Sequence, residues 1–575
     1  MPSIKRMKTF GGSGAERIYA LCQTVDSGYV FAGITNSWIG DGDLEDSFRR
    51  KANRLQVDGL NDIWIVKLDK DLKIQWQRVI GGTQLDVASA ITQTRDGNFV
   101  VSGYSYSNDG DMPVPHNCDV SLSVCKDVWA MKLNNKGDIL WKKDLGGSGD
   151  EYINAIISLN DGGTVLAGFT NSNDGDVDKK FYHDTLPFQD TGGDAWLVKL
   201  NADGELVWQK TMGGTAKDEF LAIQPAYDGG FIITGYSNSV DGDLKNIKSI
   251  YSREAWLIKF DSTFNIVWQN VVGKLTNNID TRGYAVVETK KGDFVVAGIT
   301  ASGFAVPLLN DYFVAKVDSK GKIKWRKSYG GSDDDLARTI VTVDSDDGVI
   351  VSGYTFSNDG DVTDYKGGRD AWLVRCDSLG NKTAARTIGG SDFDYIFTSL
   401  KSKSNTYVFG GYTKSKDGDV IATHNELDAW FIELNTENIV TPIVYACPLL
   451  NKNIGDTCTD NRPGTRNAKV LADCSCKGSV TAVKDVQLND NFILSDIYPN
   501  PTTGNVVADV FSPSLSKIVL KLYNNLGILI NTQNISLNAG DNKINYEALN
   551  NFSAGVYYFI FSTNDNRVVR KIVKF

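Results

Sequence analysis

The chain has 575 residues, of which 41% are hydrophobic, and its formal net charge at pH 7 is −10. A chain of this length ordinarily forms several domains, each with its own core. The acidic balance, with Lys and Arg scattered along the chain, argues against a nucleic-acid partner. No apolar run approaches the roughly 20 residues of a membrane-spanning helix, so we expect no membrane span.

Two short signals recur seven times, and their number predicts the architecture of residues 1–440. Gly-Gly steps begin at Gly11, Gly81, Gly146, Gly213, Gly330 and Gly389, with a degenerate copy at Gly273-Lys274. Asp/Glu-x-aromatic steps begin at Asp62, Asp127, Asp194, Glu254, Asp311, Asp370 and Asp428. Each copy contains apolar runs of about 6 to 9 residues bounded by Asp-Gly turns, which is typical of short antiparallel strands. Four strands in each of seven copies predict an all-β, seven-bladed β-propeller.

The chain begins inside one copy of the repeat. Residues Ile4 to Gly12 correspond to a fourth strand, whereas Asp428 to Asn435 form a third strand with no fourth strand after it. We therefore expect the N-terminal strand to complete the last blade, which removes the open edges of the ring. The tryptophans recur once per copy in two columns, so we assign them to packing between blades. The order of these elements over about residues 4 to 435 resembles kelch-type propellers, and the GGS and NSNDGDV elements resemble repeats of exported bacterial surface proteins.

Long polar loops open with Asp-Gly-Asp in six of the seven copies. Their aspartates are Asp41, Asp43, Asp109, Asp111, Asp174, Asp176, Asp241, Asp243, Asp359, Asp361, Asp417 and Asp419. Because antiparallel strands reverse direction at each turn, these loops and the Gly-Gly turns share one face of the ring, the long-loop face. Carboxylates flanking a glycine supply the hard oxygen ligands that Ca²⁺ takes. The same residues also form tight turns in which the side chains cap backbone N–H groups. Both interpretations remain open.

Six of the eight cysteines are expected to form disulfides. Two bracket a loop in the second copy and four lie in a Cys-rich linker, residues 441–491: Cys118, Cys125, Cys447, Cys458, Cys474 and Cys476. The linker has little apolar content, so covalent staples would hold its shape, and this favours an oxidising location. Zinc is the alternative, although the segment lacks a Cys-x-x-Cys pair and a His. Four cysteines allow three pairings. Cys22 and Cys376 are expected to be buried thiols.

Residues 492–575 are expected to form a separate small all-β unit, and they carry a recognisable series of sequence motifs. Its elements are the PNPTTG turn, LYNNLG, AGVYY and the basic KIVK ending, with the residues Pro499, Asn500, Pro501, Gly504, Tyr523, Gly527, Gly555, Tyr557, Lys571 and Lys574. In this order they resemble the C-terminal type A sorting domain of type IX secretion cargo. The resemblance implies recognition by the secretion machinery and cleavage as the cargo is released or attached to the outer surface of a Gram-negative bacterium. An ordinary β-sandwich accessory domain is the alternative.

The first residues, MPSIKRMKTF, contain no apolar signal-peptide core. Since strand-forming residues begin within a few positions of Met1, we expect the numbering to start at a trimmed mature chain.

Catalytic motifs are scarce. The histidines His116, His183 and His424 fall in long loops of different copies, without a Ser/His/Asp or Cys/His arrangement around them. The sequence therefore favours a monomeric surface binding or adhesion module over an enzyme. Its acidic long-loop face would hold a glycan or protein ligand, with Ca²⁺ as the candidate cofactor. The alternative is a secreted glycosidase or lyase with carboxylates near the central channel.

Overall fold

The computed structural model describes most of the chain in two compact units, Met1–Ile439 and Val440–Phe575. The described residues are 2–38, 40–44, 61–113, 126–178, 192–247, 253–273, 278–302, 309–420, 424, 426–436, 469–470, 476–477, 487–488, 492–498, 505–512, 514–525, 528–547, 549, 552–562 and 567–574. No helix among them is both long and apolar enough to cross a membrane.

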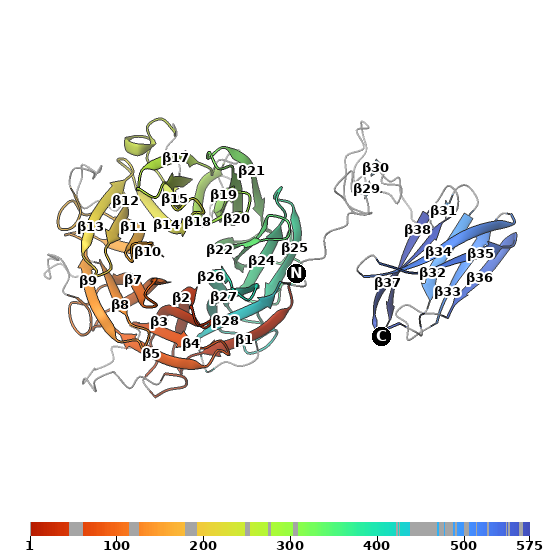
Figure 1. Ribbon diagram of the computed structural model, residues 1–575, viewed down its shortest axis with the longest axis horizontal. Helices are drawn as coiled ribbons and strands as arrows, with labels where there is room; N and C mark the ends of the chain where they lie inside the picture. Colours follow the sequence, from red (N-terminus) through yellow and green to blue (C-terminus); the bar gives the residue numbers. More distant parts are fainter. Residues whose placement is uncertain are drawn as a thin grey trace. The chain divides into compact units, whose positions relative to one another are not determined.

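The first unit contains seven four-stranded antiparallel sheets, the blades, arranged around an axis (Figure 1). Blades 1 to 3 comprise β2 (Glu16–Gln23), β3 (Tyr29–Thr35), β4 (Asp62–Leu68), β5 (Ile74–Ile80); β6 (Asp86–Gln93), β7 (Phe99–Ser105), β8 (Asp127–Leu133), β9 (Ile139–Leu145); and β10 (Glu151–Ser158), β11 (Thr164–Thr170), β12 (Asp194–Leu200), β13 (Leu206–Met212).

Blades 4 and 5 comprise β14 (Asp218–Pro225), β15 (Phe231–Ser237), β16 (Glu254–Phe260), β17 (Ile266–Val271), with a short 3₁₀ turn η1 (Gly242–Leu244) after β15; and β18 (Asn278–Glu288), β19 (Phe294–Ser302), β20 (Asn310–Val317), β21 (Ile323–Tyr329). Blades 6 and 7 comprise β22 (Asp335–Val343), β23 (Gly348–Thr355), β24 (Asp370–Cys376), β25 (Lys382–Ile388); and β26 (Asp394–Lys401), β27 (Thr406–Thr413), β28 (Asp428–Asn435), with β1 (Ile4–Phe10) as the fourth strand. The predicted seven-bladed propeller is confirmed.

The N-terminal strand closes the ring, as the sequence predicts. β1 pairs antiparallel with β28, with Met7 opposite Ile432 and Phe10 opposite Ala429. Phe10 is fully buried and its ring centroid lies 5.6 Å from that of Phe31 in blade 1. The first strands of neighbouring blades contact one another around the whole ring, including β2 with β26. The inner wall of the propeller is therefore continuous.

A buried aromatic residue anchors the third strand of each blade. Six are tryptophans, all at most 1% exposed: Trp64, Trp129, Trp196, Trp256, Trp372 and Trp430. Each lies opposite a glycine of the second strand, as Trp64 does opposite Gly33. A Cβ on Gly33 would lie 1.8 Å from the carbonyl oxygen of Arg17, where the first strand bulges. Glycine at this position therefore lets the bulged strand approach closely.

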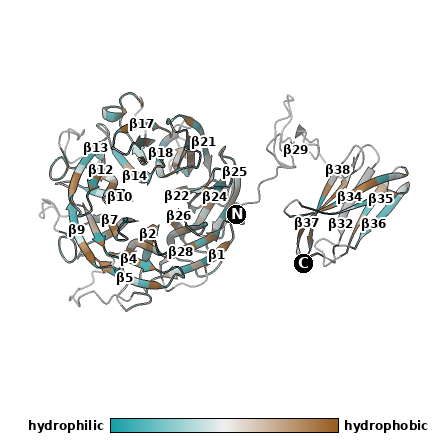
Figure 2. Cartoon of the chain, viewed as in Figure 1, coloured by the Kyte–Doolittle hydropathy of each residue, from teal (hydrophilic) through white to brown (hydrophobic). Residues whose placement is uncertain are grey.

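The second tryptophan column joins consecutive blades. The indole N–H of Trp76 donates to the carbonyl oxygen of Asn135 at 2.9 Å, and that of Trp141 donates to Ala202 at 3.1 Å. Each ring lies against the glycine of the next blade's third-to-fourth turn, Gly137 and Gly204. Both columns therefore serve packing, as expected, and hydrophobic positions recur along the strands of both units in Figure 2.

The second unit contains two four-stranded sheets and a separate two-stranded pair. One sheet has the order β31 (Gln487–Leu488), β32 (Phe492–Tyr498), β33 (Val506–Ser512), β36 (Gly540–Tyr546); the other has β35 (Leu529–Leu537), β34 (Ser516–Asn524), β37 (Gly555–Ser562), β38 (Arg567–Lys574). The pair is β29 (Lys469–Val470) with β30 (Cys476–Lys477). Residues of both sheets share one core, for example Val510, Leu520 and Phe559.

Candidate functional site

The Gly-Gly turns on the long-loop face are held by three acidic residues each. At the junction of blades 2 and 3, Glu151 accepts a hydrogen bond from Gly147 N at 3.0 Å, and Asp174 accepts one from Ser148 N at 2.7 Å. Asp176 N donates to the carbonyl oxygen of Gly146 at 2.8 Å. The turn that links the two blades is thus bound both to the next first strand and to the Asp-Gly-Asp loop.

This arrangement recurs at every Asp-Gly-Asp loop. The first aspartate accepts from a backbone N–H of the Gly-Gly turn at 2.7 to 2.9 Å in six places: Asp41, Asp109, Asp174, Asp241, Asp359 and Asp417. The N–H of the second aspartate donates to the first glycine at 2.8 to 3.0 Å: Asp43, Asp111, Asp176, Asp243, Asp361 and Asp419. The turn-capping interpretation accounts for these contacts.

The predicted aspartates are distributed around the ring, one pair per blade, and not gathered at one place. Within the described part of the chain, no group of three or more His, Cys, Asp or Glu side chains is placed to hold a metal ion. Calcium binding by these loops stays a prediction.

Two carboxyl groups meet beneath most of these turns. A Cβ on Gly81 would lie 2.3 Å from Asp62 Oδ1 and 2.8 Å from Asp86 Oδ2. Burial, reinforced by the neighbouring Asp62 carboxylate, raises the pKa of Asp86 to about 6. Burial raises the pKa of Asp218 and Asp335 to about 6 and that of Asp370 to about 7. The Asp/Glu-x-aromatic pattern of the sequence contains Asp62 and Asp370, but it does not reveal their pairing with a second, buried acid.

The fifth copy departs from this pattern. Thr281 takes the place of the buried acid and its hydroxyl donates to the carbonyl oxygen of Gly273 at 3.1 Å. The Asp-Gly-Asp loop that the other copies carry is missing there, as the sequence shows. A threonine can satisfy one backbone group but cannot accept the several hydrogen bonds that a carboxylate accepts.

A second feature of this face breaks the repeat and involves side chains that the sequence analysis did not single out. Aromatic and charged residues lie around the axis, mostly on the first strands and at the ends of the second strands. We call them the tyrosine–arginine belt: Arg17, Tyr19, Tyr152, Glu219, Tyr236, Asp280, Arg282, Tyr284, Arg338, Tyr354, Tyr395, Phe397 and Tyr412. The first strands β2, β6, β10, β14, β18, β22 and β26 surround the axis (Figure 1). Five belt residues on these strands are partly exposed: Arg17, Tyr19, Tyr284, Arg338 and Phe397.

On one side of the belt the charges are paired. Glu219 is buried and accepts hydrogen bonds from Tyr152 Oη at 2.9 Å, Tyr236 Oη at 2.7 Å and Asn154 Nδ2 at 3.1 Å. Asp280 accepts from Arg253 and Arg282, both at 2.8 Å. We call these blades, 3 to 5, the paired sector. Burial, followed by the Glu219 charge, raises the pKa of Tyr152 and of Tyr236 far above the ordinary tyrosine value.

On the other side, in blades 6, 7 and 1, arginines lie against rings. The Arg17 guanidinium lies 5.0 Å from the Tyr412 ring centroid, and that of Arg338 lies 4.5 Å from Tyr284. These blades also hold a cluster of buried tyrosines, Tyr354, Tyr395 and Tyr412, with centroids 4.1 Å and 4.6 Å apart in succession. With the flanking Arg369, these residues form the arginine sector.

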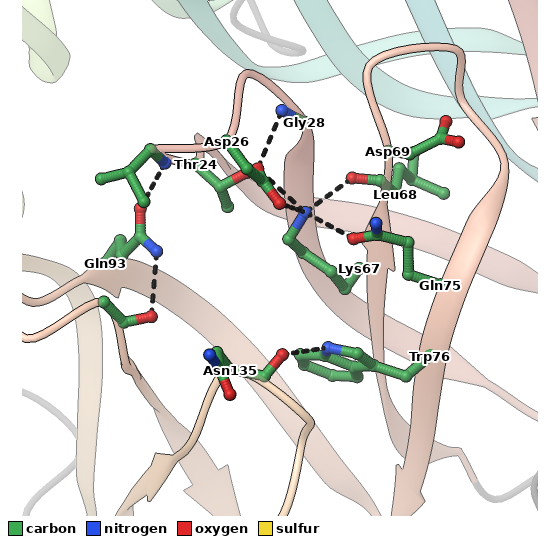
Figure 3. Close-up of polar contacts among 12 residues, drawn as sticks. Thr24, Asp26, Gly28, Lys67, Leu68, Asp69, Gln75, Trp76, Gln93 and Asn135 are labelled. Carbon is green, nitrogen blue, oxygen red and sulfur yellow. Dashed lines mark hydrogen bonds and ion pairs between the residues drawn. The ribbon is translucent and has the colours of Figure 1, made fainter.

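A crevice of about 500 Å³ lies on the opposite face, between the short turns of blades 1 and 2 (Figure 3). Its polar groups bind one another: Lys67 Nζ donates to Asp26 at 2.9 Å and to Gln75 Oε1 at 2.9 Å, and Gln93 bridges Val25 N and Gly97 O. The Lys67–Asp26 pair recurs in other blades as Lys132–Asp96, Lys199–Asp161 and Lys259–Asp228. This crevice is therefore a repeated groove between blades with its polar groups already paired.

The remaining candidate residues have separate outcomes. Cys376 is a buried free thiol, as predicted, whereas Cys22 is a free thiol that is only partly buried. Desolvation raises the pKa of each to about 12. His424 Nδ1 lies 3.0 Å from Asp428 Oδ1. His116, His183, Cys118, Cys125, Cys447, Cys458 and Cys474 lie outside the described residues, and no side-chain contact is described for Cys476. The predicted disulfides therefore stay predictions.

Of the residues assigned to the sorting signal, some lie within the described part of the chain and others outside it. Tyr523, Gly555, Tyr557, Lys571 and Lys574 lie in β34, β37 and β38, whereas Pro499, Asn500, Pro501, Gly504 and Gly527 fall outside the described residues. Tyr557 Oη donates to the carbonyl oxygen of Ser553 at 2.7 Å, and the buried Lys574 Nζ donates to that of Leu549 at 2.7 Å. Lys574 is therefore part of the packed unit and not a free basic tail.

Comparison with known proteins defines the C-terminal unit. Residues 496–574 match the family model of the secretion system C-terminal sorting domain. The chain is therefore cargo of the type IX secretion route: a secreted or surface-attached β-propeller protein of a Gram-negative bacterium, whose sorting domain engages the secretion machinery.

The propeller has more distant likenesses. The regulatory protein FlaEY of Caulobacter vibrioides is 27% identical over 234 residues, which cover 37% of this chain and 24% of that protein. The matched part thus spans about a quarter of that relative's length. A protein of unknown function from Dyadobacter fermentans is 12% identical, with a TM-score of 0.38, over 75% of this chain and 99% of that chain. A Synechocystis apocarotenoid oxygenase is 10% identical, with a TM-score of 0.34, over 75% and 94%.

Proposed function

We propose that the exported propeller is a binding or adhesion module that holds a ligand at the long-loop mouth of its central channel. The observation that carries this proposal is the tyrosine–arginine belt. Scaffold features such as the buried tryptophans recur blade by blade, whereas the first-strand residues of the belt differ from one contributing blade to the next, as Arg17 and Tyr19 of β2 differ from Tyr395 and Phe397 of β26. A binding site for one ligand requires such a departure from symmetry.

The chemistry of the belt supports binding. Ligand sites are commonly lined by aromatic side chains with a few placed polar groups. Belt residues Arg17, Tyr19, Tyr284, Arg338 and Phe397 are partly exposed. Tyr19 and Phe397 come from adjacent blades, with centroids 5.3 Å apart. The carboxylate-bound turns make the surrounding scaffold rigid, which lowers the entropic cost of binding.

The long loops add to the same face. Trp38 follows β3 in the long connection of blade 1 and is 59% exposed. An exposed indole in a connection of the long-loop face adds to the aromatic surface of that face. We propose the acidic loops as the outer part of this ligand surface, with Ca²⁺ as the bridging ion.

Calcium binding by the loops has its own test. A ligand that binds only the folded protein raises the melting temperature. We expect Ca²⁺ to raise the melting temperature of the full chain, EDTA to reverse the rise, and Asp174→Asn with Asp176→Asn to reduce it. A melting temperature that does not respond to Ca²⁺ would leave these aspartates with the turn role alone.

A carbohydrate-active enzyme is the second candidate, and Glu219 is the observation that favours it. A glycosidase needs two carboxyl groups about 5 to 9.5 Å apart. Glu219 is a buried carboxylate close to the axis, but Tyr152, Tyr236 and Asn154 already donate to it. Asp280 is bound by two arginines. These contacts suit fixed acceptors better than a proton donor and a nucleophile.

A glycan array probed with the full chain tests the binding proposal. We expect binding to one class of glycan, and its loss when Tyr19 and Phe397 are both changed to Ala. Tyr227→Ala is the matched control, since this tyrosine is 72% exposed on the short-turn face. Binding that is unaffected in the double variant contradicts a site at the channel mouth. Release of shortened products from the bound glycan, abolished by Glu219→Gln, would favour the enzyme.

A further inference from the structure

Three arginines of the arginine sector lack a carboxylate partner among the described residues. Arg17 Nη1 donates to Tyr19 Oη at 3.3 Å and Arg338 Nη2 to Tyr354 Oη at 3.4 Å. Arg369 donates to Tyr395 Oη and stacks on Phe356 and Phe393, with 4.1 Å and 4.7 Å to the ring centroids. Their contacts among the described residues are with rings and hydroxyls, which do not neutralise a guanidinium.

Without an acidic partner, burying part of each of these arginines costs free energy. The Nε atoms of Arg17 and Arg338 are buried without a hydrogen-bond acceptor among the described residues. A buried charged group is normally paired. The nearby acids already have other partners: Glu16 accepts from Gly12 N and Thr35 Oγ1, and Asp335 accepts from Gly331 N and Ser357 Oγ.

The paired sector shows that the same channel can neutralise arginines. There Asp280 binds both Arg253 and Arg282 at 2.8 Å. In the arginine sector, Asp334 occupies the Asp280 position of blade 6, but its Oδ1 accepts from Asn310 N and Nδ2 at 2.8 Å. No described carboxylate binds Arg17, Arg338 or Arg369, although the whole chain carries a net charge of −10. A cationic patch inside an acidic protein therefore stands out as a place for an anion from outside the chain.

We infer that the arginine sector binds the anionic groups of an acidic polysaccharide, the carboxylate of a uronic acid or a sulfate ester. This inference rests on the proposed binding function and names its ligand class. The planar guanidinium fork matches a carboxylate or sulfate and can donate two hydrogen bonds to it. The partly exposed rings of Tyr19, Tyr284 and Phe397 offer apolar faces beside these charges for the sugar rings.

The test measures binding of the full chain to four probes: oligogalacturonate, dextran sulfate, neutral dextran and poly-L-glutamate. We expect one of the acidic glycans to bind, neutral dextran not to bind, and salt to weaken binding. Arg17→Gln with Arg338→Gln should weaken it by roughly tenfold to a hundredfold, the loss expected when charge-assisted hydrogen bonds are removed. Arg95→Gln is the matched control, because Arg95 lies on the short-turn face and donates to Asn160 Oδ1.

Each other outcome overturns the inference. These are acidic glycans that bind no better than neutral dextran, equal binding by the double variant, or binding of poly-L-glutamate alone, which would indicate an acidic peptide. Melting temperatures show that each variant is folded. If the variant with both glutamines unfolds, Arg17→Lys with Arg338→Lys replaces it. Lysine keeps the positive charge but lacks the two-donor fork of arginine, so weaker binding is expected. A neutral glycan that requires Tyr19 and Phe397 would leave the binding function standing and remove only the anionic ligand.

Discussion

At the scale of single residues, glycine and tryptophan join the blades. Gly137 has φ +82° and a Cβ there would lie 2.8 Å from the Trp76 ring, whereas Gly97 has φ +81° and open space around it. Both positions therefore require a left-handed backbone conformation. Of the two, only Gly137 must also lack a side chain, because a Cβ there would collide with the Trp76 ring.

Alanine at these two glycines separates the two effects. Gly97→Ala should cost about 1 to 2 kcal/mol, the strain of a left-handed alanine. Gly137→Ala should cost about 1 to 3 kcal/mol more, because Trp76 must move. Urea unfolding of both variants gives the comparison. Equal losses would mean that the tryptophan does not clamp the neighbouring turn.

The buried carboxyl groups predict an unusual pH dependence. In the folded protein the pKa values of Asp86, Asp218 and Asp335 are raised to about 6, above the 3.8 of an ordinary aspartate. The folded state therefore binds more protons, and stability should rise as the pH falls from about 8 to about 5. One such group contributes at most about 3 kcal/mol. Urea midpoints across this range measure the effect.

Asp335→Asn is the matched variant for this dependence. This substitution removes one titrating group. The rise in the free energy of unfolding between about pH 8 and pH 5 should therefore be smaller by the contribution of that group, at most about 3 kcal/mol. A free energy of unfolding that falls as the pH is lowered from about 8 to about 5 would contradict the burial of these pairs.

At the scale of elements, the sequence predicts the strands well because each has the same pattern of apolar runs and Asp-Gly turns. It also predicts the closing strand, since a third strand without a fourth leaves an edge to be paired. The belt could not be predicted in this way. Whether Arg17 or Arg338 faces the channel depends on which strand is innermost, and whether it has an acidic partner depends on neighbouring blades.

The Asp-Gly-Asp loops show a second limit of prediction from sequence. Sequence reasoning found every Asp-Gly-Asp loop, but a carboxylate that caps a turn and one that binds a metal share the same sequence. Only the contact between Asp174 and Ser148 N, and its counterparts, shows that the turn role is filled. The one signal of the belt that the sequence offered was the variation of residues one and three positions after each buried acid, such as Arg17 and Tyr19 after Glu16.

The closing strand supplies a prediction at this scale. Phe10→Ala removes a ring packed against blade 1 and should destabilise the propeller by about 3 to 5 kcal/mol. Deletion of residues 2–10 should leave β28 as an open edge and cause association of the protein. Size-exclusion chromatography and unfolding curves measure both changes. A synthetic peptide of residues 2–12 should restore the monomer, and a deletion variant that stays monomeric and stable would contradict closure by this strand.

At the scale of the whole molecule, export and binding are carried by different units. Deletion of residues 496–574 should abolish appearance of the protein outside the cell and retain the folded propeller in the periplasm. Fractionation of a host that has the secretion machinery shows where the protein is. Undiminished export of the deletion variant would contradict the assignment of the sorting domain.

The exported propeller is proposed to hold its ligand at the belt. Hydrogen exchange of the full chain, with and without the glycan selected on the array, tests it most directly. We expect slower exchange in the first strands around Arg17–Tyr19, Arg338 and Tyr395–Phe397, where the belt lies. Protection confined to the short turns around Asp26, Gly97 and Asn135, or to the sorting domain, would contradict it.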